Sequence, residues 1–161
     1  MLECPSCHSQ NPFNQLRCQA CGHSLAAVYV GDPSDPYLGK TLAREYTLRR
    51  NLGSGEIGMV YEAVNEEATR RVAVKVLHDD VAEAFGDDLL RWAKRAAQVR
   101  HKKIARILGA TRIDGGPTFI VTEFVPGETL MAVLKKNGPL EPARVAELLF
   151  QLCSALAPIH K

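Results

Sequence analysis

The 161-residue sequence lacks a long apolar run, a strong charge imbalance and a basic amino terminus followed by apolar residues. A membrane-spanning helix needs about 18–20 consecutive apolar residues, so we expect none in this chain. The formal net charge of +2 is too small to indicate a nucleic acid or a membrane surface as a partner. The start MLECPSCHSQ does not have the pattern of a secretory signal. We therefore expect a cytoplasmic protein that has no nucleic-acid partner.

Cysteine is scarce except at the amino terminus, where four of the five cysteines lie within the first 21 residues. An odd count clustered in this way argues against a disulfide framework. The four form two C-x-x-C pairs, a pattern that presents four thiolates to one tetrahedral zinc ion. A segment this short cannot bury enough apolar surface to fold alone, and a metal supplies the missing free energy. We predict a closed, structural zinc ribbon with the ligands Cys4, Cys7, Cys18 and Cys21.

Other interpretations of this segment stay open. The thiols could form two disulfides or stay free, and His8 or His23 could replace one ligand. A nucleic-acid-binding ribbon is a third class of function, but phosphate binding requires several basic side chains and this segment has only Arg17. The segment resembles the short zinc ribbons found at protein amino termini, a resemblance that does not identify what the ribbon binds.

The composition divides the chain into three parts. Residues 1–24 are the predicted ribbon, and residues 25–40 are a predicted linker because VYVGDPSDPYLGK is rich in Pro, Gly and Asp. Residues 41–161 alternate between strand and helix patterns. The strands are expected at 45–52, 59–65, 70–77, 103–113 and 118–124, and the helices at 87–101, 129–138 and 141–161.

The last predicted helix has an apolar stripe, and the rest of the sequence offers few residues that could pack against it. We expect this stripe to be exposed, and its residues are Val145, Leu148, Leu149, Leu152, Leu156 and Ile159.

A glycine-rich loop, LGSGEIGMVYEAV, lies between the first two strands of the third part. A G-x-G-x-x-G pattern alone is weak evidence, and a dinucleotide fold would place a helix after it. Here a strand follows, and the next strand carries Val72-Ala73-Val74-Lys75. This order is typical of the hairpin that covers nucleotide phosphates in protein kinases. The alternative is an ordinary tight hairpin with a surface lysine.

Residues 41–161 resemble the N-lobe of a bacterial Hanks-type serine/threonine protein kinase. YTLRRNLGSGEIGMVYEA, RRVAVKVL, RHKKIARILGA, TFIVTEFVPGETL and NGPL occur in the family's order. The resemblance implies an α+β fold, with a five-stranded antiparallel sheet plus one helix, followed by the first C-lobe helices. It also implies ATP as the ligand, with Mg²⁺ in a complete kinase, and proteins as substrates of the complete parent.

The resemblance also implies roles for single residues. Lys75 would pair with the α- and β-phosphates, and Thr122 would be the gatekeeper. Glu123, Phe124 and Val125 would form the hinge, whose backbone would hydrogen-bond the adenine. The remaining residues of the implied ATP site are those of the loop and the adenine wall, namely Leu52, Gly53, Ser54, Gly55, Gly58, Val60 and Ala73.

Two departures from the family pattern bear on catalysis. Trp92 stands where the family has the helix glutamate that pairs with the lysine, and Asp88 one turn earlier has a short side chain. Trp92 could instead be a core aromatic residue. The H-R-D and D-F-G motifs do not occur in the sequence, so we expect this chain alone not to catalyse phosphoryl transfer. It would be the ATP-binding portion of a kinase or, alternatively, a pseudokinase-like binding scaffold.

Overall fold

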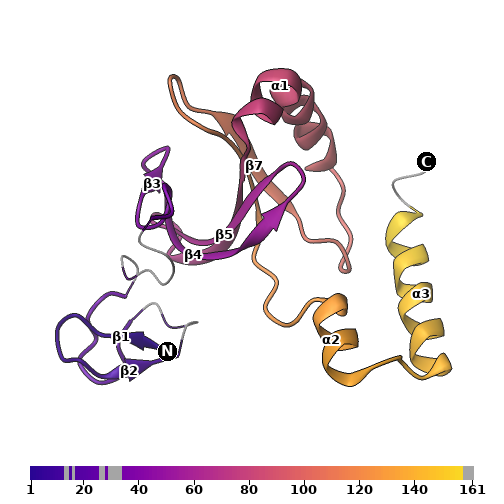
Figure 1. The fold of residues 1–161 in the computed structure, drawn as a ribbon, viewed down its shortest axis with the longest axis horizontal. Helices are drawn as coiled ribbons and strands as arrows, with labels where there is room; N and C mark the ends of the chain where they lie inside the picture. Colours follow the sequence, from indigo (N-terminus) through magenta and orange to yellow (C-terminus); the bar gives the residue numbers. More distant parts are fainter. Residues whose placement is uncertain (13–14, 16, 26–27, 29–33, 158–161) are drawn as a thin grey trace.

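The computed structural model describes residues 1–12, 15, 17–25, 28 and 34–157. Figure 1 shows three parts along the chain: a small amino-terminal unit, a twisted sheet with helix α1 (Asp79–Ala96) beside it, and two helices that extend away from the sheet. The helices that follow the sheet are α2 (Leu130–Asn137) and α3 (Pro142–Leu156).

The sheet is antiparallel throughout and carries the strands in the order β3-β4-β5-β6-β8-β7. The predicted α+β fold is confirmed, but the sheet has six strands instead of five. The extra strand, β3, has only two residues and pairs with β4, a length too short to show an alternating pattern in the sequence. The strands are β3 (Thr41–Leu42), β4 (Tyr46–Gly55), β5 (Gly58–Asn65), β6 (Arg70–Leu77), β7 (Ile107–Arg112) and β8 (Thr118–Glu123).

The core of the sheet comes from alternate positions on its strands, as the period of two requires. On β6, Val72, Val74 and Val76 are almost fully buried, and the residues between them are only partly buried. The buried cluster contains Leu42, Leu48, Tyr61, Ala63, Val72, Val74, Val76, Phe119 and Val121. The opposite positions on β5 and β6 are therefore available to line a site.

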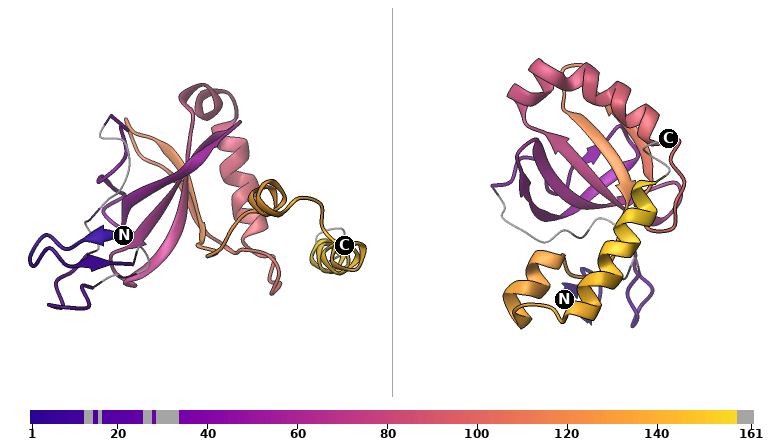
Figure 2. Two further views of the ribbon diagram at one scale, coloured as in Figure 1. Left: turned by 60° about the horizontal axis from the view of Figure 1, so that its bottom comes forward. Right: turned by 90° about the vertical axis from the view of Figure 1, so that its right-hand side faces the viewer.

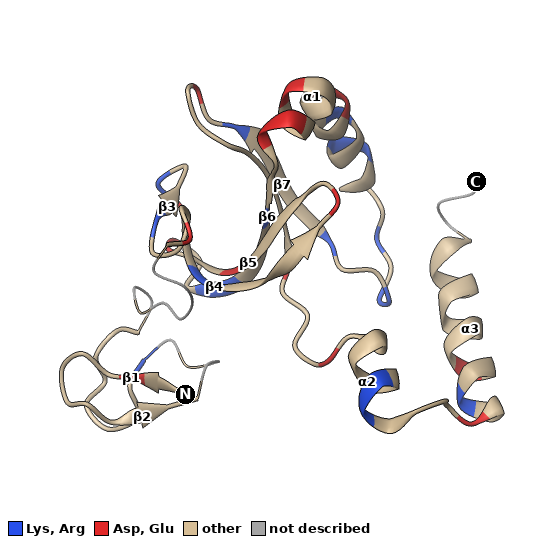
Figure 3. Ribbon diagram, in the orientation of Figure 1, with Lys and Arg blue, Asp and Glu red and all other residues tan. Residues whose placement is uncertain are grey.

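Helix α1 begins at Asp79, eight residues before the predicted start at Asp87. The sequence misled because Gly86 looks like a helix breaker. In the structure Gly86 is buried in the middle of the helix, against the side chain of Arg112. Figure 3 shows acidic residues at the start of α1 and basic residues toward its end, an arrangement that complements the helix dipole.

Helices α2 and α3 extend away from the sheet in Figures 1 and 2. Thr129 caps α2 by accepting a hydrogen bond from the backbone of Ala132. The predicted apolar stripe on α3 is confirmed as largely exposed, with Val145, Leu149, Leu152 and Leu156 each 40–56% accessible. Ile159 lies outside the described residues. In the described part of the chain, the helices are too short or too polar to cross a membrane.

The amino-terminal unit consists of two short strands, β1 (Leu2–Glu3) and β2 (Gln10–Asn11), around a cluster of Leu2, Cys4, Cys18 and Leu25. Val28 packs on that cluster, and its carbonyl oxygen accepts a hydrogen bond of 2.9 Å from Nε of Arg49 on β4. Two residues of the predicted linker, Tyr37 and Leu38, pack against the core of the sheet. The described part of that segment is thus in contact with the sheet.

Candidate functional site

The glycine loop is the tip of the hairpin between β4 and β5. The ladder between these strands ends with Gly53 opposite Val60 and Gly55 opposite Gly58. Gly53 has a φ of 139°, a conformation that side chains rarely permit. At the tip, the ring nitrogen Nε2 of His78 lies 3.1 Å from the carbonyl oxygen of Gly55. The loop therefore has the hairpin geometry that the sequence predicts.

Lys75 lies in the second half of β6, directly opposite Val60 on β5 and Ile120 on β8. Ala73 lies two residues earlier, opposite Thr122 on β8. Because side chains two residues apart on a strand share a face, Lys75 and Ala73 point to the same side of the sheet. The register thus brings together four residues that the sequence assigned to one site, namely Val60, Ala73, Lys75 and Thr122.

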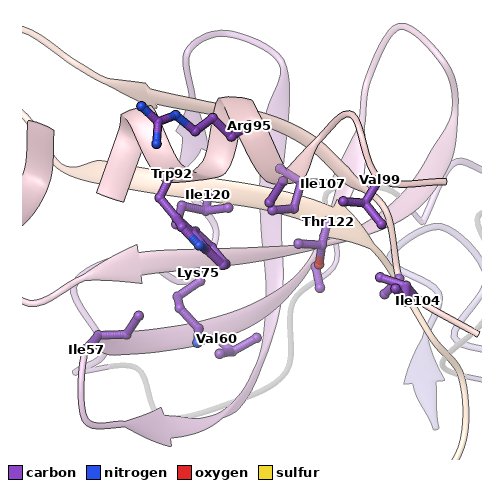
Figure 4. A pocket seen from close by; sticks show the side chains of 13 residues that line it. Ile57, Val60, Lys75, Trp92, Arg95, Val99, Ile104, Ile107, Ile120 and Thr122 are labelled. Atoms are coloured by element: carbon purple, nitrogen blue, oxygen red, sulfur yellow. The ribbon is translucent and has the colours of Figure 1, made fainter. Parts of the chain in front are cut away.

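These four residues line a cavity of about 650 Å³ between the sheet and α1, shown in Figure 4. Seven apolar residues, most of them branched, complete much of its wall: Ile57, Ala96, Val99, Ile104, Ala105, Ile107 and Ile120. The cavity suits a largely apolar group. Figure 4 shows the guanidinium of Arg95 turned away from Lys75, so Lys75 is the cation that faces this group. No acidic residue is among those that line it in the described part of the chain.

Trp92 also lines this cavity and is 58% exposed, so the interpretation of it as a core aromatic residue is wrong. Figure 4 shows it extending from α1 toward Lys75. Asp88, one turn earlier, forms an ion pair with Arg91. Among the described residues, no carboxylate forms an ion pair with Lys75.

The predicted hinge lies beside the cavity and does not line it. The Glu123 carboxylate is held by Arg106, whose backbone N–H donates to it at 3.1 Å, and Val125 is 68% exposed. Arg71 places its guanidinium 4.3 Å from the centre of the Phe124 ring, a cation–π distance. Of the loop residues, Leu52 is 42% exposed and also stays outside the cavity wall.

The apolar lining residues other than Val60 and Ala73 were missed as site residues, since aliphatic residues that line a cavity are indistinguishable from core residues in the sequence. Asp35 was also missed, because it stands in a segment that reads as a linker. Its carboxylate accepts hydrogen bonds from Tyr61 and Asn51 beneath the glycine loop. A Pro-Asp-Gly-rich composition gives no signal for such a contact.

The four amino-terminal cysteines form a second candidate site. Their sulfur atoms all lie within 4.8 Å of one another, and Cys4–Cys21 and Cys7–Cys18 are each 3.6 Å apart. A zinc ion with bonds of about 2.3 Å to four sulfurs would require sulfur separations of about 3.8 Å. The backbone N–H of Cys21 lowers the pKa of the Cys18 thiol to about 6. The donor set and its spacing fit a tetrahedral metal ion.

Comparison with known proteins agrees with this geometry. Residues 46–161 match the family described as protein tyrosine and serine/threonine kinase. The chain is 31% identical over 129 residues to serine/threonine-protein kinase pkn3 of Myxococcus xanthus, covering 79% of this chain and 24% of that protein. It is 36% identical over 131 residues to serine/threonine-protein kinase PknA of Mycobacterium tuberculosis, covering 78% of this chain and 30% of that protein.

The fold also resembles a solved structure, the PknI kinase domain of Mycobacterium tuberculosis. The TM-score is 0.63 at 26% sequence identity, and the match covers 73% of this chain and 48% of that one. The chain thus spans less than a third of either curated relative and about half of the solved kinase domain. With a family match that covers most of its length, the chain belongs to the protein tyrosine and serine/threonine kinase family.

Proposed function

We propose that this chain is the ATP-binding portion of a serine/threonine protein kinase. One observation carries the proposal: Val60 of the glycine hairpin, Lys75 and Thr122 line a single cavity whose walls are mostly apolar. The purine would pack against Val60 and Ala73, which share one face of the sheet, and the phosphates would extend under the hairpin toward Lys75. The lysine would contribute positive charge to the phosphates, and the glycines would let backbone N–H groups approach them.

Phosphoryl transfer belongs to the complete parent protein in this proposal. Mg²⁺, when bound there, would supply positive charge that offsets the charge of the phosphates. In the 161 residues of this chain, the contribution is binding: an apolar wall for the base, a flexible glycine cover and one ammonium group. We expect no ATP-dependent phosphorylation of protein hydroxyls by this chain alone.

Thermal unfolding with ATP, measured with and without Mg²⁺, tests the binding. A ligand of the native state raises stability by about 2.7 kcal/mol at a concentration 100-fold above its Kd. We expect a rise in Tm that Lys75→Met reduces, whereas Lys135→Met on the exposed surface of α2 leaves it unchanged. No rise at millimolar ATP would contradict the proposal.

A second candidate function, a pseudokinase or kinase-like binding scaffold, is favoured by Trp92. This residue occupies the cavity wall near Lys75, and no carboxylate in the described part of the chain orients that lysine. Trp92→Glu distinguishes the two functions, because it introduces a carboxylate on the cavity side of α1. If ATP stabilises this variant and leaves the wild type unaffected, the scaffold function is supported.

The amino-terminal unit is proposed to be a structural zinc ribbon. Four thiolates around one point leave no coordination position for a substrate, so a bound Zn²⁺ would serve folding. Metal analysis of the purified chain should give one zinc per molecule. Cys7→Ser should reduce that ratio and Cys153→Ser, the cysteine on α3, should not. A wild-type chain that folds without zinc and gains no stability from it would contradict the proposal.

A further inference from the structure

The carboxylate of Asp35 accepts hydrogen bonds from four groups. Oδ1 accepts from the backbone N–H groups of Tyr37 at 2.9 Å and Leu38 at 3.3 Å, and from the hydroxyl of Tyr61 at 2.9 Å. Oδ2 accepts from the side-chain amide of Asn51 at 2.9 Å. Tyr61 is fully buried in the sheet, so its hydroxyl holds the Asp35 carboxylate in a fixed position on the sheet. This small segment, which precedes the family match, is therefore attached to β4 and β5.

The amide of Asn51 continues this contact to the glycine loop. Its nitrogen donates to Asp35, and its Oδ1 accepts a hydrogen bond of 2.8 Å from the backbone N–H of Gly53, the first glycine. The register between β4 and β5 shifts between Asn51 and Gly53, so the ladder is irregular where this amide spans it. The side chain thus replaces regular strand pairing at the base of the loop.

The ladder with β5 also holds the loop, and its pairs end with Gly53 opposite Val60 and Gly55 opposite Gly58. Residues 52–56 are exposed, and His78 touches the carbonyl oxygen of Gly55 at the opposite end. Exposed segments with few contacts open most readily, so their average conformation depends strongly on the bonds at their base. Asp35 orients Asn51, since an amide free to rotate would present either its oxygen or its nitrogen to Gly53.

We propose that Asp35 and Asn51 are positioning residues that hold the glycine loop in its covering conformation. The expected effect of this role on ATP binding rests on the proposed function, whereas its effect on the conformation of the loop does not. Asp35 stands before residue 46, where the family match begins, so a segment outside the matched region would control the loop inside it. Neither side chain lines the nucleotide cavity, so any effect on binding would pass through the loop.

The experiment measures amide hydrogen exchange of residues 53–57 in the 161-residue chain, together with the Kd for ATP. Loss of one hydrogen bond costs about 1 kcal/mol, which corresponds to about fivefold in an equilibrium constant. We expect Asp35→Asn and Asn51→Asp each to accelerate exchange in the loop about fivefold and to weaken ATP binding by a similar factor. Exchange in β6 and β8 should stay unchanged, as it should in the control Asp114→Asn.

The double variant Asp35→Asn/Asn51→Asp exchanges the two groups and supplies a rescue. The introduced amide at residue 35 would accept from Tyr61 and donate to the carboxylate at residue 51, which would still accept from Gly53. We expect exchange in the loop to return to the wild-type rate. Because the swap keeps every donor and acceptor matched, it remains informative if a single variant does not fold.

The outcomes separate the two proposals. Faster exchange in the single variants and rescue in the double variant support the positioning role, even if the wild type binds no ATP, a result that would remove the proposed function alone. Wild-type exchange rates in a folded single variant would overturn the positioning role. The positioning role would also be overturned if the two single-variant increases in loop exchange rate simply added up in the double variant.

Discussion

Gly58 on β5 lies so close to Val76 on β6 that a Cβ atom at residue 58 would overlap the carbonyl oxygen of Val76. The same atom would stand 2.9 Å from the Cα of Leu77. Both neighbours are backbone atoms of the paired strand, so neither can move without breaking the ladder. The last glycine of the loop is therefore required for the sheet, apart from any contact with a ligand.

Gly58→Ala should consequently lower the free energy of unfolding by about 1–3 kcal/mol, the usual cost of forcing an atom into a packed region. Urea unfolding of both proteins measures this difference. Gly109→Ala on β7 is the matched control, because a Cβ there would meet no atom within 4 Å, and its stability should change little. Equal stability of the Gly58 variant and the wild type would show that β5 and β6 lie farther apart at residue 58 than the structure has them.

Glu62 is 2% exposed in its side chain and binds two arginines, Arg50 at 2.7 Å and Arg71 at 3.0 Å. Glu62→Gln would remove the negative charge that Glu62 presents to both guanidinium groups. Removing one partner of a fully buried pair costs about 3–5 kcal/mol, and we expect about 2–3 kcal/mol because both arginines keep some contact with water. Chemical unfolding measures the loss, with the exposed Glu67→Gln as control. A loss no larger than in the control would mean that solvent replaces the carboxylate.

The fold was predictable from the sequence wherever the pattern is local. The glycine loop, the strand with Lys75 and the exposed stripe of α3 each show in spacing and composition alone. The two-residue strand β3 and the first half of α1 were missed for different reasons. The strand is too short to have a period, and Gly86 is acceptable inside the helix only because of a neighbour, Arg112, that is distant in the sequence.

The candidate site was predictable only in part, since single positions carry roles that tertiary contacts decide. Val60, Ala73, Lys75 and Thr122 were identified by resemblance, and the register brings them to one cavity. Whether Trp92 packs in a core or lines a cavity depends on the rotation of α1, which an amphipathic pattern does not fix. Asp35 shows the same limit, because its four hydrogen-bond donors come from three different segments.

Acid should weaken the contact of Asp35 with the sheet. Burial raises the pKa of this carboxyl, but hydrogen bonds from Asn51, the Tyr37 backbone and Tyr61 outweigh it and hold the pKa below its ordinary value of 3.8. A lowered pKa in the folded state means that the carboxylate stabilises the fold above about pH 4. That contribution is lost as the pH falls through the folded-state pKa.

Asp35→Asn should therefore be less stable than the wild type at pH 7, and the difference should shrink as the pH falls below about 4. Urea unfolding at pH 7, 5, 4 and 3 measures it. Asp114→Asn in the exposed turn between β7 and β8 controls for the general effect of acid. A difference that stays constant across this range would show that the ionised form of Asp35 contributes nothing to stability.

Arg112 on β7 attaches α1 to the sheet through two groups of the helix, in Ala82 and Asp87, and also binds Thr118 of the sheet. Its Nε donates to the hydroxyl of Thr118 at 3.1 Å, its Nη2 donates to the carbonyl oxygen of Ala82 at 3.2 Å, and its Nη1 lies 3.2 Å from Asp87. Gly86 has no side chain, which leaves the space that the guanidinium fills. The helix that brings Trp92 to the cavity is thus fixed at a point two turns before it.

Arg112→Met should accelerate hydrogen exchange of residues 79–86, and it should change the fluorescence of Trp92, the single tryptophan of the chain. The loss of stability should be about 1–2 kcal/mol, because two hydrogen bonds are removed. Arg91→Met removes an exposed ion pair with Asp88, and we expect it to leave both signals unchanged. If Trp92 fluorescence responds to Arg112→Met while β6 exchanges normally, the position of Trp92 depends on this anchor. An unchanged signal would instead mean that the contacts of α1 with β6 and β8 place the tryptophan without it.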